Sequence, residues 1–379
     1  MDRYSLSPDL GLGGRLTIDL SALATNYRHI AARTSPSRAA AVVKADAYGL
    51  GAERVAPMLA AMGCRDFFVA HLAEAIPLLP LLPPDARLFI LNGLAPGTEQ
   101  LCADAGAIPV LNAPDQAARW RALAAQRGVR LPAAVQVDSG MSRLGLAADE
   151  AAALAASADF AAHVDPVLVM SHLACADTPD HGANAAQYRV FAALADRFPG
   201  VPRALANSGG AFLSSGFHGD LVRPGIALYG GAPFDGDNPM RAVVSLDARV
   251  IQTRTVAPGT GVGYGLSFTA LSQTRLATIA VGYADGLPRA LGNRGAAWFK
   301  GVRLPIAGRV SMDSISLDIS ALPEGALQPG DWVELIGPHQ SLDRLAADAG
   351  TISYEILTSL GSRYERHYLD AAGAGLEAA

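Results

Sequence analysis

Residues 42–51 read Val-Val-Lys-Ala-Asp-Ala-Tyr-Gly-Leu-Gly, and they place a lone lysine, Lys44, where an apolar strand is expected to become a loop. Partial desolvation at such a position lowers the pKa of a lysine and favours a neutral amine suited to Schiff-base formation. Tyr48 could present its hydroxyl to the same ligand, while Gly49 and Gly51 permit close approach of the backbone. The alternative is a structural lysine whose charged end reaches solvent from the end of a strand.

Around this stretch, short apolar runs alternate with helical segments in a pattern typical of repeated βα units. Eight runs are candidate strands: residues 40–43, 67–70, 88–91, 108–111, 133–137, 167–170, 203–206 and 221–222. Expected helices include residues 21–33, with a serine cap, and 114–128, with proline at the start and glycine at the end. Eight βα units predict a (β/α)8 TIM-type barrel.

The polar residues of such a barrel do their chemistry just beyond the carboxyl ends of the strands. Polar side chains follow seven of the eight predicted strands at this end: Lys44, His71, Asn92, Asp138, Arg143, His172, Asn207, Ser208 and Arg223. The alternative is that loops are polar in any protein, but the placement at seven strand ends supports the barrel.

Beyond about residue 240, short and often alternating apolar runs are separated by Gly/Pro turns, which predicts a mainly antiparallel β-domain. We therefore expect a barrel over residues 1–240 and a β-domain over residues 241–379, with an N-terminal strand that could pair with the β-domain. The Ala/Gly-rich tail from Ala371 is expected to fray.

Composition excludes several classes of protein. Half of the 379 residues are hydrophobic and 17% are charged, as in a globular protein, and the net charge of -5 without a Lys/Arg cluster argues against a nucleic-acid surface. Residues 1–14 do not read as a signal peptide, and no apolar run reaches the ~18 residues of a membrane span. The three cysteines are odd in number and far apart, which suggests neither disulfides nor a metal site and favours the cytoplasm.

The motif around Lys44 resembles the pyridoxal phosphate lysine motif of the bacterial alanine racemases, and further landmarks of that family follow in order. They are Asp138-Ser139-Gly140-Met141-Ser142-Arg143-Leu144-Gly145, Ser171-His172-Leu173, Asn207-Ser208-Gly209, Arg223-Pro224-Gly225-Ile226, Gly263-Tyr264-Gly265, Gly282-Tyr283-Ala284-Asp285-Gly286, Met312-Asp313 and Thr351-Ile352-Ser353-Tyr354-Glu355. The resemblance covers nearly the whole chain. It implies a pyridoxal phosphate-dependent isomerase that interconverts L- and D-alanine, built as a homodimer with shared active sites.

The resemblance also assigns roles at the reacting centre. Lys44 would hold the cofactor and act as one acid/base group, and Tyr264 of the partner subunit would be the other, because racemisation needs a base on each face of the substrate. Arg223 would face the pyridine nitrogen, where it can only donate. His172 would stack on the ring and link Tyr264 to Arg223. The alternatives are an ordinary tyrosine in a Gly-rich turn and a structural histidine.

Further residues are assigned by resemblance to the phosphate, the substrate and the entrance. The phosphate group would be held by Tyr48, Asn207, Ser208, Gly225, Ile226 and Tyr354. The substrate side would comprise Arg143, Met312, Asp313 and Gln136. The entrance would be lined by Tyr283, Arg289, Arg309 and Ile352. Asn207 and Ser208 could equally cap a helix. Many members of that family have a carbamylated lysine at the position of Gln136. We expect Gln136 to hold Arg143 instead, alone or with a bound anion or water, so that the protein does not depend on carbon dioxide.

Crowding by Tyr354 and Met312 implies a pocket for a methyl side chain, hence alanine as substrate and D-alanine for peptidoglycan as the product. A serine or broad-specificity racemase is an alternative. A decarboxylase of the same fold is another, but those enzymes have a glutamate where this chain has Arg223. A non-enzymatic barrel that binds the cofactor is a third, and such barrels lack the C-terminal β-domain.

Overall fold

Short parallel strands form the first of two units in the computed structural model, which describes residues 11–369. This unit comprises residues 24–228 and 232–239. Seven strands pair in chain order: β3 (Ala41–Val42), β4 (Asp66–Val69), β5 (Arg87–Ile90), β6 (Ile108–Leu111), β7 (Leu131–Gln136), β8 (Val164–Met170) and β9 (Arg203–Ala204). Phe67, Phe68 and Phe89 are fully buried, and the last two rings stack at 4.7 Å. These aromatic side chains form much of the core around the sheet.

The eighth expected strand is β10 (Leu221–Val222), which pairs in parallel with β2 (Arg38–Ala39). On one side of β10, the Val42 amide donates to the Pro224 carbonyl at 3.0 Å. On the other side, the Arg223 amide donates to the Ala206 carbonyl at 2.8 Å. The last strands are thus tied to the first, and the expected parallel α/β barrel-type fold is confirmed.

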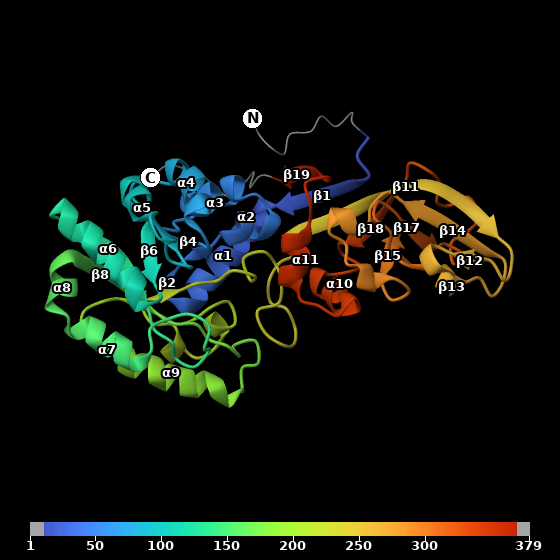
Figure 1. Cartoon of the computed structure of the whole chain (residues 1–379). Coiled ribbons are helices and arrows are strands. Elements are labelled where there is room, and N and C mark those ends of the chain that lie inside the picture. Colours follow the sequence, from blue (N-terminus) through green and yellow to red (C-terminus); the bar gives the residue numbers. More distant parts are fainter. Residues whose placement is uncertain (1–10, 370–379) are drawn as a thin grey trace. The chain divides into compact units, whose positions relative to one another are not determined.

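Helices cover the outside of this sheet, as Figure 1 shows for α6, α7, α8 and α9. The helices of residues 20–195 are α1 (Leu20–Thr34), α2 (Lys44–Gly49), α3 (Ala52–Ala61), α4 (Leu72–Leu78), α5 (Glu99–Ala105), α6 (Pro114–Arg127), α7 (Ala148–Ala156), α8 (Ala158–His163) and α9 (Gly182–Ala195). Gly128 follows the end of α6, and its φ of 65° lies in the left-handed region that favours glycine. The serine cap expected for α1 is wrong, because Asp19 Oδ1 accepts from the Ala22 amide at 2.8 Å.

Of the described residues, 11–23, 229–231 and 240–369 form the second unit, which is built on a mixed, mainly antiparallel sheet. Its principal strands are β1 (Gly14–Asp19), β11 (Val244–Val256), β14 (Thr274–Ile279), β15 (Ala296–Phe299), β16 (Val302–Pro305), β17 (Ile315–Asp318), β18 (Trp332–Ile336) and β19 (Glu365–Leu369). The long β11 pairs with β1, β14 and β18 (Figure 1). The expected β-domain is confirmed.

Strand β1 comes from the N-terminal end of the described chain and yet belongs to this second sheet. It pairs antiparallel with β11 and parallel with β19. The unit also holds the small pair β12 (Gly261–Val262) and β13 (Phe268–Thr269), and the helices α10 (Leu342–Ala349) and α11 (Ser353–Ser359). The expected fraying from Ala371 lies outside the described residues. Within residues 11–369, no helix is both long and apolar enough to cross a membrane.

Candidate active site

Lys44 opens a left-handed turn immediately after β3. Residues 45–48 have φ between 52° and 57°, so α2 is not an ordinary right-handed helix. Residues with side chains pay roughly 1–2 kcal/mol each for this conformation. Three hydrogen bonds hold the turn. Two are accepted by carboxylates: Asp46 Oδ1 accepts from the Ala52 amide at 2.7 Å, and Glu74 Oε2 accepts from the Ala45 amide at 2.9 Å. In the third, the Val43 carbonyl accepts from the Ala47 amide at 2.9 Å. Strain of this kind is typical of functional sites.

The charges of two guanidinium groups act on the Lys44 amine. Burial lowers the pKa of Lys44, the charges of Arg143 and Arg223 lower it further, and Glu74 opposes them. The same surroundings lower the pKa of His172 to about 3, first through burial and then through Arg223, Arg143 and Lys44. The His172 imidazole is therefore neutral at physiological pH, and the neutral form of Lys44 becomes more accessible there.

Arg223 is 3% exposed, and its guanidinium is anchored from one side. Its Nη2 donates to the backbone carbonyls of Ser171 and Leu205. Its buried Nε has no hydrogen-bond partner among the described residues. Burial lowers the pKa of Arg223 to about 10, so the group is still a cation at neutral pH. A buried unpaired donor is costly, and an acceptor atom of a ligand would satisfy it.

Hydroxyl groups gather beside Gly225, just after β10. Ser208 Oγ accepts from the amides of Gly225 at 2.9 Å and Ala227 at 3.3 Å, which leaves its own proton available to donate. A Cβ at Gly225 would lie 2.2 Å from Tyr48 Oη, so the phenol packs directly against this backbone. Ile226 is buried in the same segment. Hydroxyl donors beside a backbone with room only for glycine suit a phosphate group.

Asn207 has a visible structural role beside this cluster. Its Oδ1 accepts from the Gly210 amide at 3.0 Å, and its Nδ2 donates to the Leu173 carbonyl at 3.3 Å. The capping alternative therefore describes the contacts of Asn207, whereas the Ser208 hydroxyl donates to no acceptor in the described part of the chain.

The loop that carries Arg143 is organised by Asp138. Its Oδ1 accepts from three successive amides, those of Gly140, Met141 and Ser142, at 2.9, 3.0 and 3.1 Å. The Arg143 side chain follows this loop and is exposed. Gln136 is buried at the end of β7, and no hydrogen bond joins its side chain to Arg143 in the described structure. The role of Gln136 in holding Arg143 therefore stays a prediction.

Tyr264 lies in the second unit and is 70% exposed. It begins the short 3-10 turn η5 (Tyr264–Leu266), flanked by Gly263 and Gly265 at φ 71° and 70°. A Cβ at Gly265 would lie 3.3 Å from the Arg309 guanidinium, which shows that Arg309 packs against this turn. Positive φ at both flanking positions explains the two glycines. The turn presents a phenol outward on a defined backbone.

Met312 and Asp313 lie beside Tyr283 in the same unit. The amides of Tyr283 and Ala284 donate to the carbonyls of Ser311 and Met312, both at 3.0 Å. Arg363 joins the two segments through ion pairs to Asp285 at 2.9 Å and Asp313 at 2.7 Å. The other expected residues of this unit are also exposed: Arg289, Ile352 and Tyr354.

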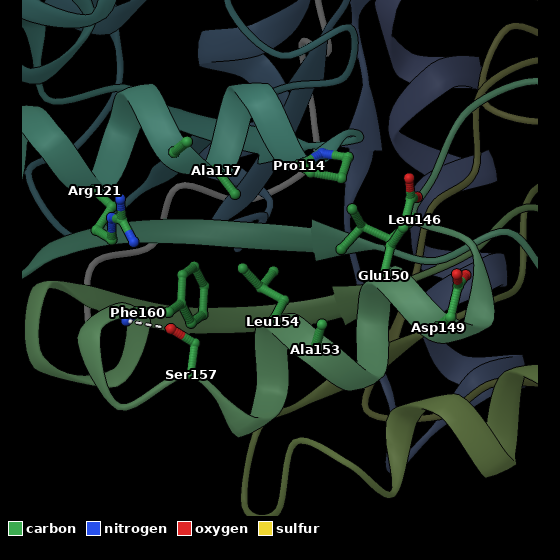
Figure 2. A pocket seen from close by; sticks show the side chains of 11 residues that line it. Pro114, Ala117, Arg121, Leu146, Asp149, Glu150, Ala153, Leu154, Ser157 and Phe160 are labelled. Carbon is green, nitrogen blue, oxygen red and sulfur yellow. Dashed lines mark hydrogen bonds between the residues drawn. The ribbon is translucent and has the colours of Figure 1, made fainter.

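A cavity of about 400 Å³ lies elsewhere in the barrel unit, between α6, α7 and α8 (Figure 2). Its lining is mainly apolar, including Leu154 and Phe160, and the charge of Arg121 is used in an ion pair with Asp159 at 2.6 Å. None of the expected site residues lines it. It is a space between helices, separate from the Lys44 cluster.

Family models match both units. One described as "Alanine racemase, N-terminal domain" covers residues 18–233, and one described as "Alanine racemase, C-terminal domain" covers residues 243–368. A protein of Agrobacterium fabrum named "Alanine racemase, catabolic" is 59% identical over 95% of this chain and 93% of its own length. The chain belongs to the alanine racemase family.

Other members of the alanine racemase family support the assignment. An "Alanine racemase" of Brucella canis is 54% identical over 97% of this chain and 96% of its own length. The crystal structure of the alanine racemase of Bartonella henselae, described with covalently bound pyridoxal phosphate, superposes with a TM-score of 0.91. The two sequences are 44% identical, and the superposition covers 94% of this chain and 99% of the Bartonella chain.

The barrel unit of this alanine racemase family member brings several expected residues together. Lys44, Arg143, His172 and Arg223 interact electrostatically, and Tyr48 and Ser208 lie beside Gly225. No hydrogen bond joins the His172 ring to Arg223 in the described part of the chain.

Sequence reasoning missed Glu74, the organising role of Asp138, and Arg363. An acid such as Glu74 on a surface helix gives no local signal, because its partner is 29 positions away. Asp138 could have been found, since an Asp before Ser-Gly often accepts from the amides of its own turn.

Proposed function

We propose that this protein is a pyridoxal phosphate-dependent alanine racemase. The observation that carries the proposal is the buried Arg223, whose Nε has no hydrogen-bond partner within residues 11–369, next to a lysine whose pKa is lowered. A cation that can only donate suits the face of an acceptor nitrogen. A fold-related decarboxylase would instead require a carboxylate at this position.

The residues present fit the cofactor. We assign Lys44 to its covalent attachment, Arg223 to the ring nitrogen and His172 to the ring face. Tyr48, Ser208, Tyr354 and the backbone of Gly225 and Ile226 are assigned to the phosphate, and Asn207 is assigned to holding the loop that carries Ser208. When bound, pyridoxal phosphate supplies an electron sink for the α-carbon of the amino acid. Because Arg223 can only donate, it would keep the ring nitrogen unprotonated, which would limit that sink and favour return of the proton.

Proton transfer needs one group on each side of the substrate. We assign one to Lys44 and the other to Tyr264 of a second copy of the chain in a homodimer. The exposure of Tyr264, and of Leu266 and Leu271 nearby in sequence, supports an interface at this surface. His172 is neutral, so it can accept a hydrogen bond and help to lower the cost of deprotonating the phenol.

The substrate carboxylate is assigned to Arg143, with Met312 and Asp313 of the second copy completing that side. Gln136 is proposed to support Arg143 through a water or an anion, with no carbamylated lysine. Mass spectrometry of the native protein should then detect no carbamyl group on an active-site lysine. The entrance is assigned to Tyr283, Arg289, Arg309 and Ile352. Slow turnover of serine is expected, because a small pocket discriminates only modestly against a hydroxyl.

The direct test is optical. The purified protein with pyridoxal phosphate should bring pure L-alanine and pure D-alanine to the same zero rotation. Rotation lost together with release of carbon dioxide would support the decarboxylase, and a cofactor band without any change in rotation would support a non-enzymatic barrel. Serine and lysine serve as comparison substrates.

We further propose that the reaction takes place in the cytoplasm and supplies D-alanine for peptidoglycan. The Agrobacterium relative is named catabolic, so breakdown of alanine is the competing role. A deletion strain that grows only with added D-alanine would support the supply role. Growth without D-alanine, but not on alanine as the carbon source, would support the catabolic one. Cell fractionation tests the location.

A further inference from the structure

Glu74 reaches the backbone directly behind the reactive lysine. It lies on α4, the helix that follows β4, and its Oε2 accepts from the Ala45 amide at 2.9 Å. Ala45 is the first residue of the left-handed turn, with φ 52° and ψ 49°. This bond therefore fixes the peptide group that joins Lys44 to the turn.

The rest of the turn is fixed without Glu74. Asp46 Oδ1 caps the start of α3 through the Ala52 amide, and the Asp46 carbonyl accepts from Gly51 at 2.9 Å. These bonds hold the far end of the turn. At the near end, where the lysine follows the strand, the side chain that holds the backbone is Glu74, through the Ala45 amide.

We propose that Glu74 is a positioning residue that anchors the Lys44 turn and supplies the negative charge facing the lysine amine. The inference rests on the proposed function for its consequence in catalysis. The hydrogen bond from Ala45 to Glu74 does not depend on that function.

Among the charged groups that act on Lys44, Glu74 differs in the sign of its charge. The groups that shift the pKa of Lys44 besides burial are Arg143, Arg223 and Glu74, and of these only Glu74 raises it. The other titratable group nearby, His172, is neutral at physiological pH. Removing the charge of Glu74 should thus lower the pKa of Lys44 further.

Other titratable groups on the elements packed against α2 are engaged elsewhere or exposed. Asp66 of β4 pairs with Arg38 at 3.3 Å and Arg87 at 2.6 Å. His71, before α4, lies 3.4 Å from Asn92. On α3, Glu53 and Arg54 are exposed. None of these shifts the pKa of Lys44.

Glu74→Gln separates charge from anchoring, because the amide oxygen can still accept from Ala45 while the charge is gone. The probe is acetic anhydride, applied to the cofactor-free full-length protein over a range of pH, with acetylation of Lys44 quantified by mass spectrometry. We expect Lys44 in Glu74→Gln to react roughly two- to tenfold faster at pH 7, because more of the amine is neutral. Glu53→Gln is the matched control and should react like the wild type.

Glu74→Ala removes the anchor as well. It should weaken pyridoxal phosphate binding, and Glu74→Gln should largely restore that binding. An unchanged pH profile of acetylation in Glu74→Gln would overturn the electrostatic role, and unchanged cofactor affinity in Glu74→Ala would overturn the anchoring role. Acetylation does not depend on turnover, so these outcomes are distinct from a failure of the racemase proposal, which would appear as absent racemisation in the wild type.

Discussion

The protonation states of single residues set the chemistry of the barrel unit. Lys44 and His172 both have lowered pKa values because burial and the charges of Arg143 and Arg223 disfavour further positive charge. Arg223 itself stays cationic. A fixed cation thus keeps a neutral imidazole and a readily deprotonated amine beside it, as a site for reversible proton transfer requires.

His172 should make the protein sensitive to acid. Its folded pKa of about 3 lies below the ordinary value of 6.5, so the unfolded chain binds the proton first as the pH falls. The stability from neutral His172 is complete above pH 6.5 and is lost as the pH falls toward 3, by up to about 1.4 kcal/mol per pH unit. Urea unfolding of the cofactor-free protein at pH 6.5 and 4.5 should show a smaller loss in His172→Gln than in the wild type.

The control for this prediction is His29→Gln, since His29 is exposed. It should lose as much stability as the wild type over the same pH range. Equal losses in His172→Gln and the wild type would contradict a neutral, desolvated His172.

At the scale of elements, the turn after β3 and the segment after β10 must fit each other. Gly225→Ala would place a Cβ 2.2 Å from Tyr48 Oη. Because the phenol must move, we expect the affinity for pyridoxal phosphate to fall at least about tenfold in a fluorescence titration. Gly182→Ala, which meets nothing within 4 Å, should bind the cofactor normally.

A second variant distinguishes displacement of Tyr48 from general damage. In Gly225→Ala with Tyr48→Phe, the nearest remaining contact is the ring carbon at 2.9 Å, so thermal stability should recover in part. Cofactor affinity should stay low because the hydroxyl is missing. Normal affinity in Gly225→Ala alone would contradict this account of the phosphate site.

Local sequence patterns predict best the helices and strands whose ends are marked by residues such as proline and glycine. Strand β6 was expected at residues 108–111 and is found there, and α6 was framed correctly by Pro114 and Gly128. The left-handed turn at Ala45–Tyr48 could not be predicted, because its residues favour other conformations and a distant carboxylate holds it. Ser21 and Asp19 are both good caps two positions apart, so only the structure selects Asp19.

At the scale of the whole molecule, local sequence patterns do not predict which strands and side chains far apart in the sequence pair with each other. Strand β19 has an uneven pattern of burial and finds its partner β1 about 350 positions away. The site residues were located through motifs, whereas Glu74 and Arg363 act across pairings that no local pattern encodes.

The proposed homodimer predicts a separable defect. Leu271 is 93% exposed in the β-domain, and Leu271→Asp should disfavour an interface there. Sedimentation should show a monomer that keeps the visible cofactor band and loses racemisation at least about 100-fold. Leu101→Asp, at a 51% exposed leucine on α5, should remain dimeric and active. A fully active monomer would contradict the assignment of Tyr264 to a second copy.

The central claim is that Lys44 and Tyr264 act on opposite faces of alanine, and exchange of the α-hydrogen in D2O tests it most directly. In Tyr264→Phe, proton NMR should show one enantiomer exchanging its α-hydrogen at least about tenfold faster than it inverts, with the other nearly inert, because Lys44 alone serves one face. Equal exchange of both enantiomers accompanied by inversion at the wild-type rate would contradict the claim.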